Sequence, residues 1–169
     1  GKLERATFDA TLNELAQHVR AVAKAAEPFG VVLAVEVNWM APCRSYRTAA
    51  ELVRRVEAPN VGLVWDPAHF FSTPSRVDDL DLARGRIVHA HLDDICPCFT
   101  EVINVNSDRV LPGQGILPLR AWTEKVAACG YAGWHCVDLF NEALWAKDLE
   151  TICHETMAAC KAVWPEAEF

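Results

Sequence analysis

The sequence of this 169-residue chain contains no apolar run that approaches the roughly 20 residues needed to cross a bilayer. Its first residues, Gly1 to Arg5, show no signal-peptide core, and we therefore expect a cytoplasmic protein. The chain also lacks an excess of basic residues, since its formal net charge is −7. Nucleic-acid grooves depend on clustered Lys and Arg, so this balance argues against nucleic-acid binding as the main function.

Regular cysteine spacing and glycine-rich phosphate loops are missing as well. The seven cysteines are odd in number and irregularly spaced, which argues against a secreted disulfide framework. No G-x-G-x-x-G or Walker loop follows an apolar segment, which weakens a nucleotide-binding interpretation. Cys96-Pro97-Cys98, with His89 and His91 upstream, could form a soft zinc site. Because no second cysteine pair completes a tetrahedral ligand set, we favour free thiols.

Apolar patterning predicts one α/β domain over residues 1–169, with no internal linker. Buried strands are predicted at Val31 to Met40, Val61 to Phe70, Arg86 to Ile95 and Gly133 to Phe140. Helices are predicted at Thr7 to Glu27, Tyr46 to Val56, Val77 to Arg84, Leu119 to Cys129 and Asp148 to Val163. This alternation is typical of βαβ units around a parallel sheet. The stretch from Cys96 to Leu117 reads as a long loop.

Each predicted strand delivers a polar residue that can bind a metal near its carboxyl end. These residues are Glu36, Asp66, His91 and Asp138. In a parallel barrel the strand ends meet at one rim, where the active sites of such barrels lie. A mixed set of oxygen and nitrogen ligands suits Mn, Mg, Co, Fe or Zn better than a soft metal.

Further polar residues accompany this set. Asn38 shares a strand face with Glu36, His69 follows Asp66, and His89 and Asp93 share a face with His91. Taken singly, an acid at a strand end is more often a helix cap, and a strand histidine such as His89 is more often a core group. The repetition on successive strands favours a functional site, because burying so many polar groups otherwise costs free energy.

The remaining histidines look structural. His135 lies on the opposite face of its strand from Asp138 and is expected to pack against a helix. His18 and His154 lie on predicted helices and are expected at the surface.

The segments VVLAVEVN, PNVGLVWDPAHF, RIVHAHLDD, RVLPGQGILPL and GYAGWHCVDLFNEALW together resemble the xylose isomerase-like TIM barrel family. This family includes sugar phosphate isomerases and epimerases, inosose isomerases and dehydratases, and ketose 3-epimerases. The resemblance implies that the chain forms strands 5–8, the C-terminal half of a (β/α)8 barrel, and lacks the first four βα units. Three explanations of the missing half stay open: the chain is a fragment or processed piece, it forms a homo-oligomer, or a partner supplies the missing half-barrel.

The resemblance also implies roles for the site residues. Glu36 matches a metal ligand that doubles as an acid/base, while Asp66 and His91 match further metal ligands. Asp138 stands where the family usually has a glutamate that is both the last metal ligand and a second acid/base.

The implied substrate contacts are His69 and Arg109, and Asn38 and His89 are candidates beside them. Gln114 stands where the family loop more often has Glu or Asp, which bears on the same contacts.

The implied activity is that of a divalent-metal-dependent isomerase or epimerase of a sugar or polyol. Such an enzyme removes a proton next to a carbonyl, which is enediolate chemistry. Three alternatives stay open: a dehydratase of an inosose or related keto-polyol, a non-catalytic truncated subunit or scaffold, and a phosphodiesterase of the kind that cleaves DNA at abasic sites.

Overall fold

The computed structural model describes residues 4–39, 42–98, 101–104 and 107–169. Its central feature is a parallel sheet with the strand order β1-β2-β3-β6. The strands are β1 (Leu33–Glu36), β2 (Val61–Trp65), β3 (Ile87–Leu92) and β6 (His135–Val137). The predicted α/β class and the parallel strands are therefore confirmed, with shorter strands than the sequence indicated. Met40, the last residue of the first predicted strand, lies outside the described residues.

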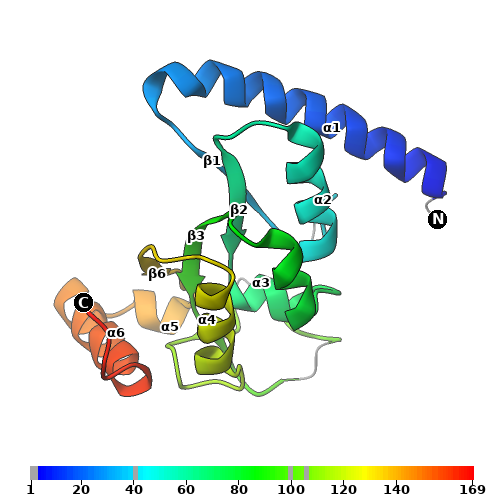
Figure 1. Cartoon of the computed structure of the whole chain (residues 1–169). Coiled ribbons are helices and arrows are strands. Elements are labelled where there is room, and N and C mark those ends of the chain that lie inside the picture. The colour runs from blue at the N-terminus through cyan, green and yellow to red at the C-terminus, as the bar shows by residue number, and fades with distance from the viewer. Residues whose placement is uncertain (1–3, 40–41, 99–100, 105–106) are drawn as a thin grey trace.

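Helices connect these strands and flank them (Figure 1). They are α1 (Arg5–Ala26), α2 (Tyr46–Val56), α3 (Pro67–Ser72), α4 (Leu119–Ala128), α5 (Glu142–Trp145) and α6 (Leu149–Val163), with 3-10 helices η1 (Glu27–Phe29) and η2 (Val77–Ala83). In Figure 1, α1 crosses the top of the molecule and α6 lies at the opposite, C-terminal side. Among the described residues, no helix combines the length and apolar character that a membrane span requires.

The two faces of the sheet differ in what covers them. On one face Leu63, Trp65 and Ala90 are fully buried and belong to a core shared with α1, α2 and α4. On the other face, Ala34 and Cys136 are exposed. Strand side chains alternate between faces, so this second face corresponds to the interior of a barrel that the described strands close only in part.

The second strand is shorter than predicted because Asp66 starts a helix. The Asp66 Oδ1 atom accepts a hydrogen bond from the His69 N–H at 2.7 Å, and Pro67 occupies the first helical turn. Both features favour helix initiation, so the predicted strand Val61 to Phe70 was wrong beyond Trp65. As a result, His69 reaches the site from α3 rather than from a strand.

The region after β3 also differs from the prediction. The strand expected to run to Ile95 stops at Leu92, and β4 (Asp94–Ile95) pairs in antiparallel fashion with β5 (Arg109–Val110). The stretch expected to be a long loop therefore contains a strand that carries Arg109. The short helix α5 was also not predicted; Asn141 Oδ1 accepts a hydrogen bond from the Leu144 N–H at its start.

The buried carboxylate of Asp94 holds the loop that follows β5. Its Oδ1 accepts hydrogen bonds from the N–H groups of Ile95 and Leu117, both at 2.9 Å. Its Oδ2 accepts from Gly113 at 3.1 Å and Gly115 at 3.0 Å. A Cβ atom at Gly115 would lie 2.3 Å from Asp94 Oδ1, so the loop can wrap the carboxylate only with glycine there.

Replacing this carboxylate should destabilise the fold. We expect Asp94→Ala to lower the free energy of unfolding by about 3 kcal/mol, because several buried N–H groups lose their acceptor. Chemical denaturation would measure the loss. Asp78→Ala, at an exposed position of η2, is the matched control and should have little effect. Equal stabilities of the two variants would contradict the anchoring role.

Candidate metal centre

Glu36, Asp66 and His91 converge at the carboxyl ends of β1, β2 and β3. One donor atom from each of them lies within 4.8 Å of the other two. The Nδ1 atom of His91 is 3.2 Å from Glu36 Oε1 and 3.2 Å from Asp66 Oδ2. Three separate segments of the chain thus bring two carboxylates and an imidazole to one point.

Asp138 stands at the margin of this group. It follows β6, and its N–H donates a hydrogen bond to Leu92 O at 3.1 Å, which extends the pairing of β6 with β3. Its Oδ2 lies 3.7 Å from His91 Nδ1 but only 3.0 Å from Arg109 Nη1. The structure therefore places Asp138 beside the three converging donors, with its carboxylate engaged by an arginine.

The donor set fits a divalent ion. Glu36 Oε1 is buried and makes no well-aligned hydrogen bond with the described residues, although His91 Nδ1 is 3.2 Å away. A buried carboxylate oxygen without a partner costs free energy that a cation would offset. The carboxylates of Asp66 and Glu36, each 3.2 Å from His91 Nδ1, raise the pKa of His91 to about 10, which favours a proton on the ring where no cation is bound. Metal binding through Nδ1 would displace that proton.

Arg109 is the central cation of the site. Its side chain is fully buried, and Nη1 lies 3.0 Å from Asp66 Oδ2 and 2.5 Å from Asp93 Oδ2. Burial alone would lower the pKa of Arg109, but the charges of Asp66, Asp93 and Asp138 raise it. Burial likewise tends to raise the pKa of Asp66, which the His91 hydrogen bond and the charge of Arg109 nevertheless lower. The contact of Arg109 with substrate stays a prediction.

Asp93 is a site residue whose role the sequence did not reveal. Its Oδ1 accepts a hydrogen bond from the Ala68 N–H at 2.9 Å, which ties β3 to the start of α3. Burial and the charge of Asp66 raise its pKa well above the usual range. The sequence did indicate its placement, because Asp93 lies two residues after His91 and four after His89, and alternate residues of a strand point to the same face.

The predicted substrate residues border the same centre. His69 Nε2 lies 3.2 Å from Arg109 Nη2 and 3.3 Å from Asn38 Nδ2. Both neighbours are donors, so Nε2 acts as an acceptor, and burial lowers the pKa of His69 in keeping with a neutral ring. His89 packs edge-on against His91, with ring centroids 5.0 Å apart. Their contacts with substrate stay predictions.

The other histidines lie away from the centre. His135 is half-buried on the opposite face, where its ring contacts the rings of Trp65 and Tyr131 at centroid distances of 6.2 and 5.3 Å. Its packing partners are therefore these aromatic rings of β2 and the loop before β6, not only a helix as predicted. His18 and His154 are exposed on α1 and α6, which confirms the prediction of surface positions.

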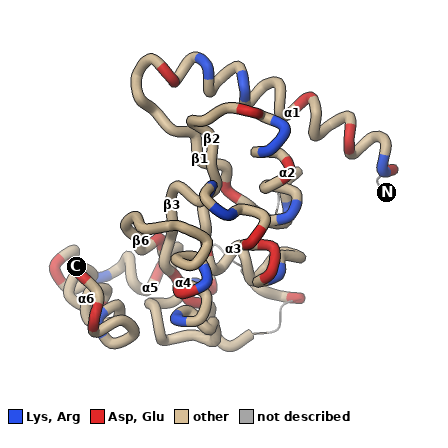
Figure 2. The backbone as a smooth tube through the Cα atoms, in the orientation of Figure 1, with Lys and Arg blue, Asp and Glu red and all other residues tan. Residues whose placement is uncertain are grey.

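Outside the centre, basic and acidic residues are mixed along the surface. Figure 2 shows basic and acidic residues interspersed along α1, α2 and the C-terminal elements. Several of the basic side chains pair with acids: Arg55 with Asp9 and Glu51, Arg120 with Glu166, Lys125 with Asp81, and Lys147 with Glu155. This pairing gives no support to a phosphate-binding groove on the part of the chain that the structure describes.

Comparison with known proteins agrees with this fold and site. The sequence model of the xylose isomerase-like TIM barrel family matches residues 1–159. The chain belongs to this family. An inosose isomerase of Bacillus subtilis (strain 168) is 33% identical over 118 residues, which cover 69% of this chain and 42% of that protein. A 3-dehydroshikimate dehydratase of Pseudomonas aeruginosa is 28% identical over 135 residues, 78% of this chain and 21% of that protein.

Among solved structures, the chain is similar to the crystal structure of the IolI protein with a bound zinc atom. The TM-score is 0.87 and the identity 26%, over 96% of this chain and 58% of that one. The chain spans only part of its relatives' length: the match to the curated inosose isomerase of Bacillus subtilis covers 42% of that protein. Together with the four parallel strands, the match shows that the described fold is a partial barrel of this family.

Removing the buried arginine should destabilise the fold. We expect Arg109→Met to lower the free energy of unfolding by about 3 to 5 kcal/mol, because it leaves buried carboxylates without their counter-charge. Chemical denaturation is the measurement. Arg54→Met removes an exposed arginine that pairs with Glu51 and should change little. If Arg109→Met were as stable as this control, Arg109 would not be the organising cation.

Proposed function

We propose that the chain carries the metal-binding half of a divalent-metal-dependent isomerase that acts on a sugar, polyol or inosose. The observation that carries this proposal is the convergence of Glu36, Asp66 and His91 at the carboxyl ends of three parallel strands. The similarity to inosose isomerases and to a dehydratase of the same family supports it. The bound zinc of the IolI protein supports a metal at this place, with Mn, Mg, Co, Fe or Zn as candidates.

In this proposal the ion is held by Glu36, Asp66 and His91, with Asp138 as a fourth ligand. A bound divalent ion supplies Lewis-acid polarisation of a carbonyl and a neighbouring hydroxyl. Glu36 removes the proton from the carbon beside the carbonyl, since its carboxylate is 36% exposed and borders the open face of the sheet. Reprotonation of the resulting enediolate at the neighbouring carbon gives the isomer.

The residues around Glu36 orient the substrate in this proposal. His69 has a buried Nδ1 atom without a hydrogen-bond partner among the described residues, which leaves it one unused polar atom. Asn38 and Arg109 contact its Nε2 and fix the ring. His89, beside His91, lines the same face of the sheet. These side chains would hold the hydroxyl and carbonyl oxygens while Glu36 moves the proton.

The state of Asp138 bears on the type of reaction. Epimerisation by two bases needs a second group that can accept a proton freely. Asp138 Oδ2 accepts a hydrogen bond from Arg109 Nη1 at 3.0 Å, so this oxygen is already engaged and is less available to take up a substrate proton. This contact supports one-base isomerisation over two-base epimerisation.

Dehydration is the second candidate reaction. It shares proton removal by Glu36 and then expels a hydroxide ion from the next carbon, so it also needs only one base. The similarity to a 3-dehydroshikimate dehydratase supports dehydration as an alternative reaction. The product decides between the two: isomerisation conserves the atoms of the substrate, whereas dehydration releases water and leaves a carbon–carbon double bond.

Glu36→Gln tests the base. With an inosose in D2O, the unaltered protein should exchange the hydrogen beside the carbonyl for deuterium, and the variant should be slower by about 100-fold or more. NMR follows the exchange, and metal content is measured on the same samples. Glu14→Gln, in exposed α1, is the matched control.

The metal content separates two ways for Glu36→Gln to lose exchange. Exchange lost with metal retained supports Glu36 as the base, and exchange lost together with metal supports only a ligand role. Unchanged exchange in Glu36→Gln would refute its assignment to the chemistry.

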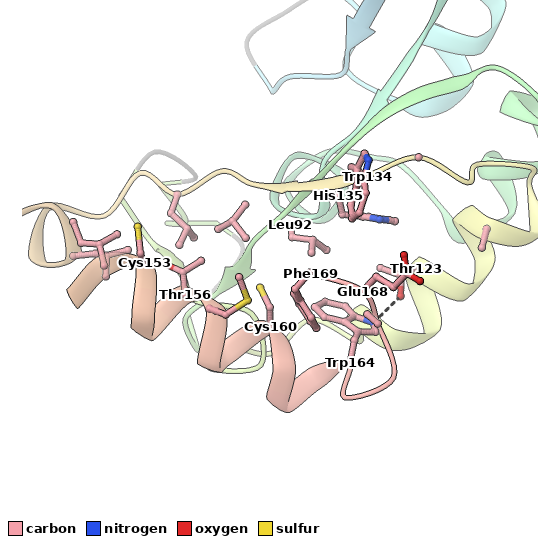
Figure 3. Close-up of a pocket in the computed structure, with 18 of the residues that line it drawn as sticks. Leu92, Thr123, Trp134, His135, Cys153, Thr156, Cys160, Trp164, Glu168 and Phe169 are labelled. Atoms are coloured by element: carbon pink, nitrogen blue, oxygen red, sulfur yellow. Dashed lines mark hydrogen bonds between the residues drawn. The ribbon is translucent and has the colours of Figure 1, made fainter. Parts of the chain in front are cut away.

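We also propose that further βα units close the barrel. Beside β6, the structure has a groove of about 1000 Å³ between this strand and α6, lined by Leu92, His135, Cys160, Trp164 and Phe169 (Figure 3). Trp134, at its rim, is 71% exposed. The β1 and β6 edges carry no strand partner among the described residues. Apolar grooves and free strand edges of this kind are normally covered in a family barrel.

Native mass spectrometry combined with elemental analysis tests this arrangement. If two copies of the chain close one barrel, the protein should be a dimer with a divalent metal in each copy. A monomer that binds metal would exclude closure by a second copy of the chain and leave another polypeptide or a longer form of the protein as the source of the covering units. A metal-free monomer that catalyses no exchange would instead favour a non-catalytic scaffold.

A further inference from the structure

A second group of metal-binding side chains lies at the end of the β4–β5 hairpin. The Sγ atoms of Cys96 and Cys98 and a carboxylate oxygen of Asp108 all lie within 4.8 Å of one another. The thiols follow β4 and the aspartate precedes β5. The Cys96 N–H donates a hydrogen bond to Asp108 O at 3.0 Å, so the backbone pairing itself holds the two sides together.

The aspartate is held in place by its own loop. Its Oδ2 accepts a hydrogen bond from the Asn104 N–H at 2.8 Å, and its Oδ1 accepts from Ser107 Oγ at 3.3 Å. Cys96, Cys98 and Asp108 are all partly buried, and neither cysteine forms a disulfide. The carboxylate is therefore oriented toward the thiols before any ligand arrives.

This arrangement differs from the one the sequence indicated. The sequence favoured free thiols and offered His89 and His91 as the only candidate partners of a soft zinc site, but His91 belongs to the centre with Glu36 and Asp66. The third donor comes instead from the far side of the hairpin, across a stretch of chain that was expected to be a long loop.

We propose that Cys96, Cys98 and Asp108 form a second metal site, selective for a thiophilic divalent cation such as Zn²⁺. Two thiolates favour such an ion over Mg²⁺ or Mn²⁺, and three protein ligands leave one tetrahedral position for water. Burial and the neighbouring Cys98 and Asp108 raise the pKa of the Cys96 thiol, so binding of the ion as a thiolate complex displaces protons.

The site lies where it can support the first centre. Asp108 directly precedes Arg109, whose guanidinium contacts the carboxylates of Asp66, Asp93 and Asp138. An ion that joins β4 to β5 at this end would restrain the backbone that presents Arg109. The second site thus acts on the hairpin that carries Arg109 and uses none of the ligands of the first.

Cobalt substitution tests the proposal with a signal that the first centre cannot give. Co²⁺ bound by thiolate has an intense charge-transfer absorption in the near ultraviolet, whereas carboxylate and imidazole ligands give none. The unaltered protein, titrated with Co²⁺ in a non-thiol reductant, should develop this band. Asp66→Asn should keep the band, because it affects only the first centre.

Matched serine variants locate the thiolates. Cys96→Ser with Cys98→Ser should abolish the band, and Cys136→Ser with Cys153→Ser, at two exposed cysteines elsewhere, should leave it unchanged. Asp108→Asn keeps an acceptor for the Asn104 N–H and should still fold, but it should weaken Co²⁺ binding about tenfold or more in competition with a chelator. Far-ultraviolet circular dichroism verifies folding of each variant.

Several outcomes would overturn the site. The absence of a band in the unaltered protein would do so, as would a band that persists when Cys96 and Cys98 are both serine. Undiminished affinity in Asp108→Asn would remove the aspartate from the ligand set and with it the three-ligand site.

Discussion

The contact of one buried guanidinium with several carboxylates organises this half-barrel. Arg109 lies between the ends of β2, β3 and β6, where Asp66, Asp93 and Asp138 bring negative charge together. Without a cation these acids would repel one another and face a large desolvation cost. The β4–β5 hairpin carries Arg109 to the rim of the barrel, and the loop that follows it is held by hydrogen bonds to Asp94.

The same charge balance holds the candidate metal ligands together on a four-stranded sheet. Glu36, Asp66 and His91 all come from this chain, so the proposed metal site needs no ligand from the other half of a barrel. What the open face of the sheet lacks is a wall opposite Glu36. In the proposed function, proton transfer would therefore belong to this half, and selectivity for a particular substrate to the units that close the barrel.

Much of the architecture could be predicted from the sequence. Long apolar strands and amphipathic helices have clear periodicity, and alternation of faces places Glu36 and His91 on one side. The short pair β4–β5 could not be predicted, because two-residue strands have no periodicity.

The start of α3 was missed for a related reason. The six residues of α3 are too few to show helical periodicity, and only the capping bond of Asp66 and the position of Pro67 in the first turn identify the helix. Asp94 and Asp108 look like surface acids until long-range backbone pairing brings their partners to them. Pairing across a hairpin depends on residues far apart in the sequence, so local composition does not predict it.

The loop around Asp94 combines one fixed and one free position. Gly115 has no room for a side chain, whereas its neighbour Gln114 is exposed and not constrained by packing. A substitution at Gln114 can therefore introduce a new recognition residue without changing the hydrogen bonds that hold the loop.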